Sequence, residues 1–260
     1  MKHHLVILIL LFGATSLFAQ NTNNSVIVPI LIYHAIRPTK SADTPSVLNY
    51  VCTPETLEKE LSFLKTNNYQ SISFSDVVAH FKWGKTLPQN PVIISFDDSW
   101  EDQINYGVPL LVKYGFKATF FVIVGSINTK YQMTWDDIRM LDLIGMEIGC
   151  HTFSHPFLTQ LTTPRRMFAL NKELVGSKKI LESALGHPIT AFAYPYGQYN
   201  DILIERLKEA GYTSARTTYP GIIHAEKDLF NLTGIIRTES MAYFINDLNE
   251  YFGELEGIAQ

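Results

Sequence analysis

The sequence lacks most of the features that would place it in a specialised class of protein. Its 260 residues carry a formal net charge of −4, so there is no basic excess for binding nucleic acid. Charged residues make up 18 % of the chain, below the usual ~25 %. The chain shows no internal repeat, no low-complexity tract and no domain linker. Since 46 % of the residues are hydrophobic, we expect one large core in a single domain.

Cysteine is scarce as well, with only Cys52 and Cys150. An exported protein can form a disulfide, but the sequence does not decide whether these two residues meet. Cys150 lies inside an apolar strand pattern, which favours a small buried side chain. A thiolate metal ligand is the alternative, and it is less favoured because His151 and His155 already follow it closely.

The N-terminal apolar run is too short to span a membrane comfortably. It covers residues 5–12, whereas a span needs about 20 residues. With Lys2 before it and small residues up to Ala19, it predicts a secretory signal peptide at 1–19; an uncleaved anchor is the alternative. The absence of a nearby cysteine argues against a lipoprotein. We therefore expect residues 20–260 to form a secreted or periplasmic domain without a stable membrane span.

The rest of the chain alternates regularly between strand-like and helix-like segments. Apolar, β-branched strands are predicted at 26–34, 91–98, 117–125, 146–152, 189–197, 212–218 and 232–238. Helices are predicted at 53–68, 74–84, 105–115, 134–145, 163–185, 200–211 and 240–252, and 38–50 is the one long loop. This alternation indicates an α/β fold with a parallel sheet, either a closed or nearly closed barrel or an open doubly wound sheet.

Polar side chains gather where the predicted strands end. The candidates are His34, then Asp97 and Asp98, then His151 and His155, and finally Tyr194, Pro195 and Tyr196. Barrel enzymes keep their chemistry at the carboxyl ends of their strands, so we expect these residues to converge. Two imidazoles and one carboxylate form a three-ligand metal site with positions left for water and substrate. The second aspartate can then remove a proton from that water.

Each candidate also has a plain structural interpretation. The histidine pair could be two ordinary polar residues at a strand end, and His34 could be bonded to a neighbouring carbonyl. Asp136 and Asp137 provide an internal comparison, because they follow Thr134 at a helix start and are explained by capping. Asp97 and Asp98 follow a buried strand and have no such explanation. His80, His187 and His224 are expected to be exposed to solvent.

Three motifs in this order resemble those of the polysaccharide deacetylase family, also called carbohydrate esterase family 4 or the NodB homology domain. "SFDD" (95–98) is similar to its T-F-D-D motif, "HTFSH" (151–155) to H-S/T-x-x-H, and "AYPYG" (193–197) to R-x-P-Y. The resemblance covers about residues 26–240. It implies a distorted (β/α) barrel of seven or eight strands, the NodB-type fold. It also implies removal of acetate from N-acetylated, or sometimes O-acetylated, sugars.

The resemblance assigns a role to each residue. It implies that Asp97 is the catalytic base and that Asp98, His151 and His155 bind a divalent metal, zinc first, with cobalt, nickel or manganese as alternatives. The acetylated oligosaccharide or polysaccharide would be the binding partner, with Pro195 and a backbone N–H near Tyr196 at the substrate and its oxyanion. "LIYHAI" (31–36) is similar to a branch acting on poly-β-1,6-N-acetylglucosamine, in which an N-terminal histidine, here His34, is the general acid.

The chain also departs from the family pattern. The third-motif arginine is Ala193, the glycine after the two aspartates is Ser99, and no histidine follows His224. Arg216 or Arg237 could replace the missing arginine, and the sequence does not rank them. The alternatives are an acetylxylan-type esterase, a peptidoglycan or chitin-oligomer deacetylase, and, from another class, a catalytically silent glycan-binding module.

Overall fold

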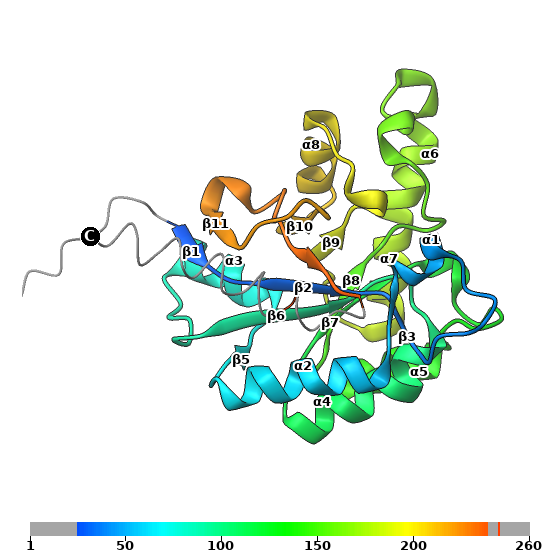
Figure 1. Ribbon diagram of the computed structural model, residues 1–260. Helices are drawn as coiled ribbons and strands as arrows, with labels where there is room; N and C mark the ends of the chain where they lie inside the picture. The colour runs from blue at the N-terminus through cyan, green and yellow to red at the C-terminus, as the bar shows by residue number, and fades with distance from the viewer. Residues whose placement is uncertain (1–24, 239–243, 245–260) are drawn as a thin grey trace, which may run out of the picture.

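The computed structural model describes residues 25–238 and Phe244 (Figure 1). The predicted signal peptide lies outside the described residues, as does the predicted helix at 240–252 except for Phe244. None of the helices in the described ranges is long and apolar enough to cross a membrane.

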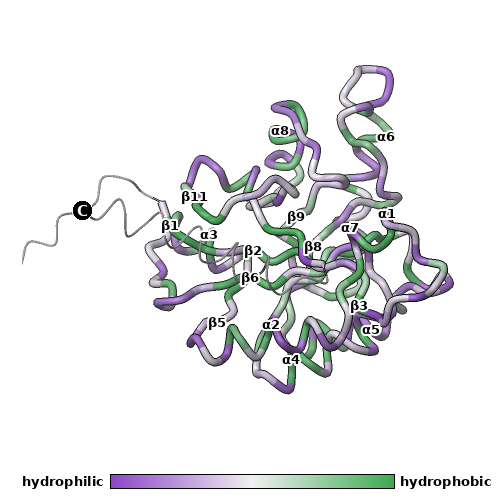
Figure 2. The backbone as a smooth tube through the Cα atoms, viewed as in Figure 1, coloured by the Kyte–Doolittle hydropathy of each residue, from purple (hydrophilic) through white to green (hydrophobic). Residues whose placement is uncertain are grey.

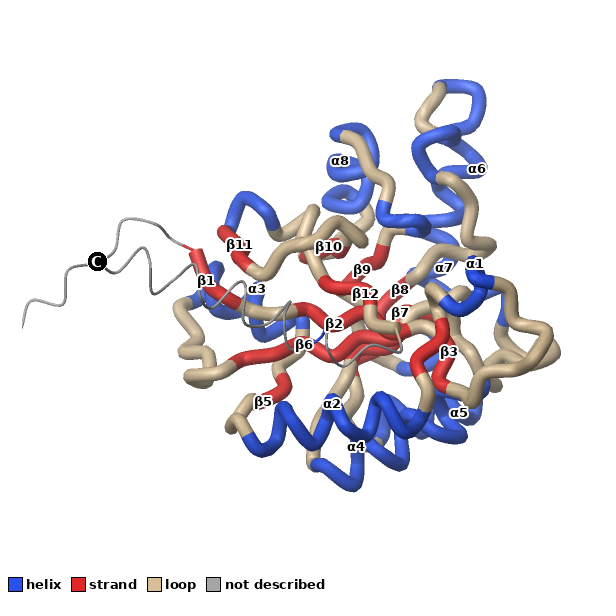
Figure 3. Tube along the Cα trace, in the orientation of Figure 1, coloured by secondary structure: helices blue, strands red, loops and turns tan. Residues whose placement is uncertain are grey.

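A curled parallel sheet forms the centre of the molecule, with helices around it (Figure 3). Its spatial order is β10 (Ser214–Arg216), β9 (Ala191–Ala193), β8 (Glu147–Cys150), β7 (Thr119–Val122), β6 (Pro91–Phe96), β2 (Ile30–Tyr33) and β12 (Ile235–Ile236), and β5 (Gln70–Ser71) also pairs with β6. Every pair in this sheet is parallel. The predicted α/β fold with a parallel sheet is therefore confirmed.

The two edges of the sheet are joined by the segment that precedes β12. The Ala215 N–H donates to the Leu229 carbonyl at 2.8 Å, and the Thr217 N–H donates to the Leu232 carbonyl at 2.8 Å. Residues next to β12 therefore bond directly to β10, and the sheet closes into a distorted barrel rather than an open sheet. This closure brings the first strand next to the last ones.

The helices form an outer layer, and α3 (Phe74–Trp83) closes the barrel at its amino end. They are α1 (Pro45–Leu48), α2 (Pro54–Thr66), α3 (Phe74–Trp83), α4 (Val108–Tyr114), α5 (Trp135–Leu143), α6 (Met167–Asn171), α7 (Ser177–Leu185) and α8 (Asp201–Glu209). Alternate strand residues face two cores: Leu31 and Tyr33 pack in the core with α2, whereas Ile30 and Ile32 pack in the core with α3. Hydrophobic residues follow the strands, and hydrophilic ones concentrate in the outer loops and helices (Figure 2).

The predicted boundaries need three corrections. The predicted strand 26–34 is divided into β2 and a separate strand β1 (Ser25–Ile27), which pairs antiparallel with β11 (Ile223–Ala225). The predicted helix 163–185 is interrupted by a π-helical turn, Lys172–Gly176. The predicted loop 38–50 contains the short helix α1, which begins at a proline, where a missing N–H costs nothing. The short strands β3 (Ala35–Ile36) and β4 (Val51–Cys52) precede and follow α1 in the chain and pair with each other.

Candidate active site

All five predicted catalytic and metal-binding residues lie together at the carboxyl end of the barrel. His34 follows β2, the two aspartates follow β6, and the two histidines follow β8. His34 Nε2 lies 3.8 Å from Asp97 Oδ2. Asp98 Oδ1 lies 3.5 Å from the Nε2 atoms of both His151 and His155. Three separate segments therefore supply one compact polar cluster.

The two aspartates diverge because the chain turns sharply after β6. Asp98 and Ser99 have φ angles of 73° and 60°, in the left-handed region that favours glycine. This explains the glycine of the family motif. Here Ser99 adopts the same conformation, and its Oγ accepts the Ile123 N–H at 2.9 Å, which holds the turn against β7. Asp97 is buried toward the barrel, whereas Asp98 remains partly exposed toward the histidines.

Asp98, His151 and His155 meet the requirements of a three-ligand metal site. One donor atom from each lies within 4.8 Å of the others. The two Nε2 atoms are 3.1 Å apart, and each lies 3.5 Å from Asp98 Oδ1. Ligands at 2.0–2.1 Å from a tetrahedral zinc ion are separated by about 3.3 Å, so these three atoms fit one ion without rearrangement. A donor set of two imidazoles and a carboxylate suits zinc and related divalent metals.

Both histidines direct Nε2 at the Asp98 carboxylate. His151 Nδ1 lies 2.8 Å from the Ala193 carbonyl, a contact in which the ring must donate, and this leaves the Nε2 lone pair directed at the cluster. Burial lowers the pKa of His155 to about 4. Burial also opposes a charge on His151, but the nearby Asp98 and Asp97 carboxylates together outweigh it and raise the His151 pKa. The same histidines lower the pKa of Asp98 despite its burial, so the carboxylate is ionised.

Asp97 is a buried carboxylate paired with a buried arginine. Arg216 Nη2 donates to Asp97 Oδ1 at 2.5 Å and to Oδ2 at 2.6 Å. Burial acts to raise the pKa of Asp97, but Arg216, together with His151 and His34, outweighs it and the pKa is lowered. His34 faces the same carboxylate, and burial lowers its pKa although Asp97 and Asp98 oppose the shift. The site thus holds an ionised carboxylate next to an imidazole that gives up a proton readily.

Arg216 occupies the place of the arginine that is missing from the third motif. In the parallel pairing of β10 with β9, Arg216 lies directly opposite Ala193. Its guanidinium therefore reaches Asp97 from the neighbouring strand, 119 residues away in sequence. Arg237 lies elsewhere and pairs with Glu60 at 2.7 Å. The structure thus ranks the two arginines that the sequence left equal.

The predicted substrate residues lie at the rim of the site. Tyr196 has a φ of 59°, and its half-exposed ring lies 4.6 Å from the His155 ring and stacks on Phe157 at 4.0 Å. Pro195 is buried beneath this turn. The Tyr194 hydroxyl instead donates to the Phe230 carbonyl at 3.0 Å, so this tyrosine belongs to the core.

A groove of about 860 Å³ leads away from Asp98. Aromatic side chains from separate segments line it: Tyr50, Trp100, Tyr106 and Tyr131. Tyr50 also contacts the His34 ring at 5.0 Å. Sequence reasoning missed these residues, because isolated aromatic residues in loops carry no periodic signal. It also missed Gln103, whose buried amide donates to the carbonyls of His34 at 2.8 Å and Asp97 at 2.6 Å and so ties the two strand ends together.

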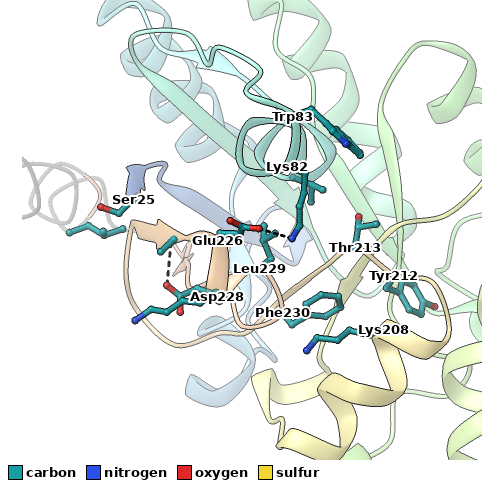
Figure 4. A pocket seen from close by; sticks show the side chains of 14 residues that line it. Ser25, Lys82, Trp83, Lys208, Tyr212, Thr213, Glu226, Asp228, Leu229 and Phe230 are labelled. Atoms are coloured by element: carbon teal, nitrogen blue, oxygen red, sulfur yellow. Dashed lines mark hydrogen bonds and ion pairs between the residues drawn. The ribbon is translucent and has the colours of Figure 1, made fainter. Parts of the chain in front are cut away.

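A larger hollow, of about 1200 Å³, lies at the opposite end of the barrel (Figure 4). Ser25 and Thr213, which line it, precede strands β2 and β10. Lys82 pairs with Glu226 across it at 2.6 Å. None of the predicted site residues lies there, so the smaller groove at the carboxyl end is the candidate substrate site.

The remaining histidines and cysteines differ partly from expectation. His224 is buried in β11, where its Nε2 bonds the Val28 carbonyl at 3.0 Å, so the expectation of an exposed side chain is wrong. The reason is that the 223–225 segment pairs with β1 as a strand. Cys52 and Cys150 are both buried and no disulfide joins them, which confirms the apolar interpretation of Cys150.

Comparison with known proteins agrees with this site. A family model described as polysaccharide deacetylase matches residues 84–215, just over half of the chain. The Bacillus subtilis (strain 168) protein YxkH is 29 % identical over 205 residues, covering 79 % of this chain and 69 % of the relative. The poly-beta-1,6-N-acetyl-D-glucosamine N-deacetylase of Staphylococcus aureus (strain MRSA252) is 27 % identical over 180 residues, covering 65 % of this chain and 62 % of the relative.

Solved structures show the same relationship. The Streptococcus pyogenes deacetylase PplD, determined in complex with acetate, has a TM-score of 0.76 and 29 % identity, and the match covers 83 % of this chain and 94 % of that one. The matching family model, the named relatives and the shared fold lead to one conclusion. The chain belongs to the polysaccharide deacetylase family, whose members are enzymes.

Proposed function

We propose that this protein hydrolyses the N-acetyl group of N-acetylglucosamine units in an exported polysaccharide. The first candidate for this polysaccharide is poly-β-1,6-N-acetylglucosamine. The observation that carries the proposal is the joining of a three-ligand cluster to an arginine-paired aspartate and to a histidine from the first strand. The position of His34 on β2 resembles the branch that acts on this polymer. The S. aureus relative named for that activity supports the same substrate. The predicted signal peptide supports export to the periplasm or the outside of the cell.

The residues divide the reaction between them. Asp98, His151 and His155 would hold a divalent metal, zinc in our proposal, which would supply Lewis acidity toward the acetyl carbonyl and a water. Asp97 accepts a proton from the attacking water, and Arg216 keeps that carboxylate ionised and oriented.

The departing sugar amine and the developing oxyanion use other groups. His34 donates a proton to the amine as the amide bond breaks. Burial lowers its pKa, so the protonated ring is a stronger acid than a solvated histidine. We assign the stabilisation of the negative charge on the carbonyl oxygen to a backbone N–H of the Tyr196 turn, because the Tyr196 ring lies 4.6 Å from that of His155.

The groove beside the site suits a chain of sugars. Its aromatic rings offer apolar faces with polar edges, which complement the faces and hydroxyls of pyranose rings. Its lining includes the exposed side chains of Tyr50 and Tyr131, so the groove opens to solvent where a polymer can reach it. This supports a polysaccharide rather than a small acetylated metabolite.

The test is acetate release from N-acetylglucosamine oligomers with β-1,6 and β-1,4 linkages, measured side by side with added zinc or cobalt. Release from the β-1,6 oligomer that stops with a chelator is the expected result. Preference for β-1,4 oligomers would change the substrate to chitin or peptidoglycan. Release only from O-acetylated xylan would make the protein an esterase. Metal binding without any release would leave a silent binding module.

A further inference from the structure

The loop that carries both metal-binding histidines is held in a conformation that it would not keep alone. Between β8 and the turn that follows, Thr152 and His155 have φ angles of 71° and 56°. Residues other than glycine are rarely found there, because Cβ approaches the backbone. These two turns fold the loop so that the rings of His151 and His155 meet. Such a backbone persists only where surrounding contacts determine it.

The carbonyl side of this loop is held by the segment after β7. The Val124 N–H donates to the Thr152 carbonyl at 3.1 Å, and the Gly125 N–H donates to the Phe153 carbonyl at 2.8 Å. A Cβ at Gly125 would lie 2.6 Å from that carbonyl oxygen, so only glycine allows the approach. This side of the loop therefore depends on backbone contacts alone.

The N–H side of the loop is held by a single buried carboxylate. Glu173 Oε2 accepts the N–H groups of Phe153 at 2.9 Å and Ser154 at 2.8 Å. Its Oε1 accepts the Ser154 hydroxyl at 2.7 Å. Glu173 is 6 % exposed, and within the described residues no basic side chain forms an ion pair with it. Its charge is therefore satisfied by three donors of the histidine loop.

The placement of Glu173 is itself unusual. It lies in the π-helical turn Lys172–Gly176 between α6 and α7, and such turns often mark functional sites. The neighbouring Lys172 Nζ lies 4.2 Å from the centre of the Phe153 ring. Adjacent residues of one turn thus hold both the backbone and the side chain of the loop centre.

We propose that Glu173 is a positioning residue for metal binding, which sets the separation of His151 and His155 through the backbone between them. This inference rests on the metal site of the proposed function. Groups that orient metal ligands typically change metal affinity by about 10–100-fold when they are removed. Glu173 has no contact with the substrate groove, so its effect should appear in metal binding before it appears in KM.

The chain offers a matched control for this residue. Glu147 also accepts two backbone N–H groups and a serine hydroxyl, from Phe74 and Ser75, at 2.9, 3.0 and 2.6 Å. It therefore holds a backbone segment by the same kinds of bonds, and it also accepts the Thr119 hydroxyl at 2.7 Å. That segment is the start of α3 at the amino end of the barrel, away from the histidines. Loss of either carboxylate should destabilise the fold, but only Glu173 should change metal binding.

The experiment is titration of the full-length mature protein with cobalt(II) or zinc(II), following cobalt absorbance and competition with a chelator. Glu173→Ala should weaken binding about 10-fold or more, whereas Glu147→Ala should bind as the unsubstituted protein does. Glu173→Gln should restore most of the affinity, because its amide oxygen can accept both N–H groups while its NH₂ donates to the Ser154 hydroxyl. If the uncharged Glu173→Gln variant regains the metal affinity, the hydrogen bonds of residue 173, and not its charge, position the histidine loop.

Several outcomes would overturn this inference. Equal metal affinity in Glu173→Ala and the unsubstituted protein would reduce Glu173 to a structural residue. So would an equal loss in Glu147→Ala. If Glu173→Ala does not fold, Ser154→Ala removes one of the three bonds and should weaken binding about threefold; unchanged binding there would have the same meaning. An unsubstituted protein that binds no metal would instead overturn the proposed metal site, and the Glu173 inference with it.

Discussion

The two ends of the barrel are built on opposite principles. At the amino end, α3 inserts Phe74, Val77 and Val78 among strand side chains in an apolar core. At the carboxyl end, buried positions hold charged and polar groups, among them His34, Asp97, His151 and Arg216. Six of the eight non-glycine residues with positive φ in the described chain also belong to this end: Asp98, Ser99, Tyr131, Thr152, His155 and Tyr196.

This difference shows where the fold is stabilised and where that stability is used. Residues in the left-handed region cost of order 1 kcal/mol or more each, and buried charges require partners. The apolar end and the outer helices supply the burial that offsets these costs. Substitutions at the carboxyl end should therefore act mainly on activity, whereas substitutions at the amino end should act mainly on stability.

His155→Ala should abolish activity while the protein stays folded. It removes one of three metal ligands, and losing a metal that stabilises transition-state charge by several kcal/mol lowers turnover by about 10³-fold or more. Acetate release and bound zinc are measured together. His187→Ala, an exposed histidine paired with Asp142, is the control and should change neither. Full activity in metal-free His155→Ala would separate the reaction from this cluster.

Arg216→Met should lower both activity and stability. It leaves Asp97 buried without its charged partner, which typically destabilises a protein by about 3–5 kcal/mol. Activity should fall about 10²-fold because the base is neither oriented nor kept ionised. Arg237→Met is a matched control, since it breaks the buried pair with Glu60 and should cost similar stability with a much smaller loss of activity. Denaturant unfolding and acetate release measure the two effects.

Arg216→Met should also shift the pH dependence of activity. Arg216 lowers the pKa of Asp97, so the base stays ionised to a lower pH than a free carboxyl. Without the guanidinium, the largest effect that opposes burial is lost and the pKa of Asp97 rises. The acidic limb of kcat/KM should therefore move to higher pH in Arg216→Met than in the unsubstituted protein. An unmoved limb would mean that Asp97 does not control it.

His34→Ala should slow turnover by about 10²-fold and leave the metal in place. The reason is that His34 lies next to Asp97 but is not one of the three clustered ligands. Zinc content and kcat are the measurements. His224→Ala, another buried histidine, should leave kcat within about twofold. Full turnover in His34→Ala would exclude this histidine as the acid.

Val77→Ala, at the amino end, should lower stability with little effect on activity. It removes buried methyl groups from the α3 core and should cost about 2 kcal/mol of stability. Because Val77 lies at the amino end, kcat well below the unfolding temperature should stay within about twofold. A large loss of activity in the folded variant would show that the two ends are coupled.

Much of the site was predictable from neighbouring letters in the sequence. Asp97 and Asp98 follow a buried strand directly, and His151 and His155 lie within one short loop, so their chemistry is visible locally. His34 was assigned on a resemblance, and its place beside Asp97 agrees with that assignment. The Thr134–Asp137 capping box was also predicted, since it depends on residues three apart.

The alternation of strands and helices, the residues at the strand ends and the order of the motifs are properties of short segments, so they are visible without a structure. The folded chain was needed to see that Arg216 rather than Arg237 pairs with Asp97, that Glu173 holds the histidine loop, and that four distant aromatic residues line one groove. The physical reason is that these contacts depend on strand register and barrel closure. Both are set by the packing of the whole chain, not by any local pattern.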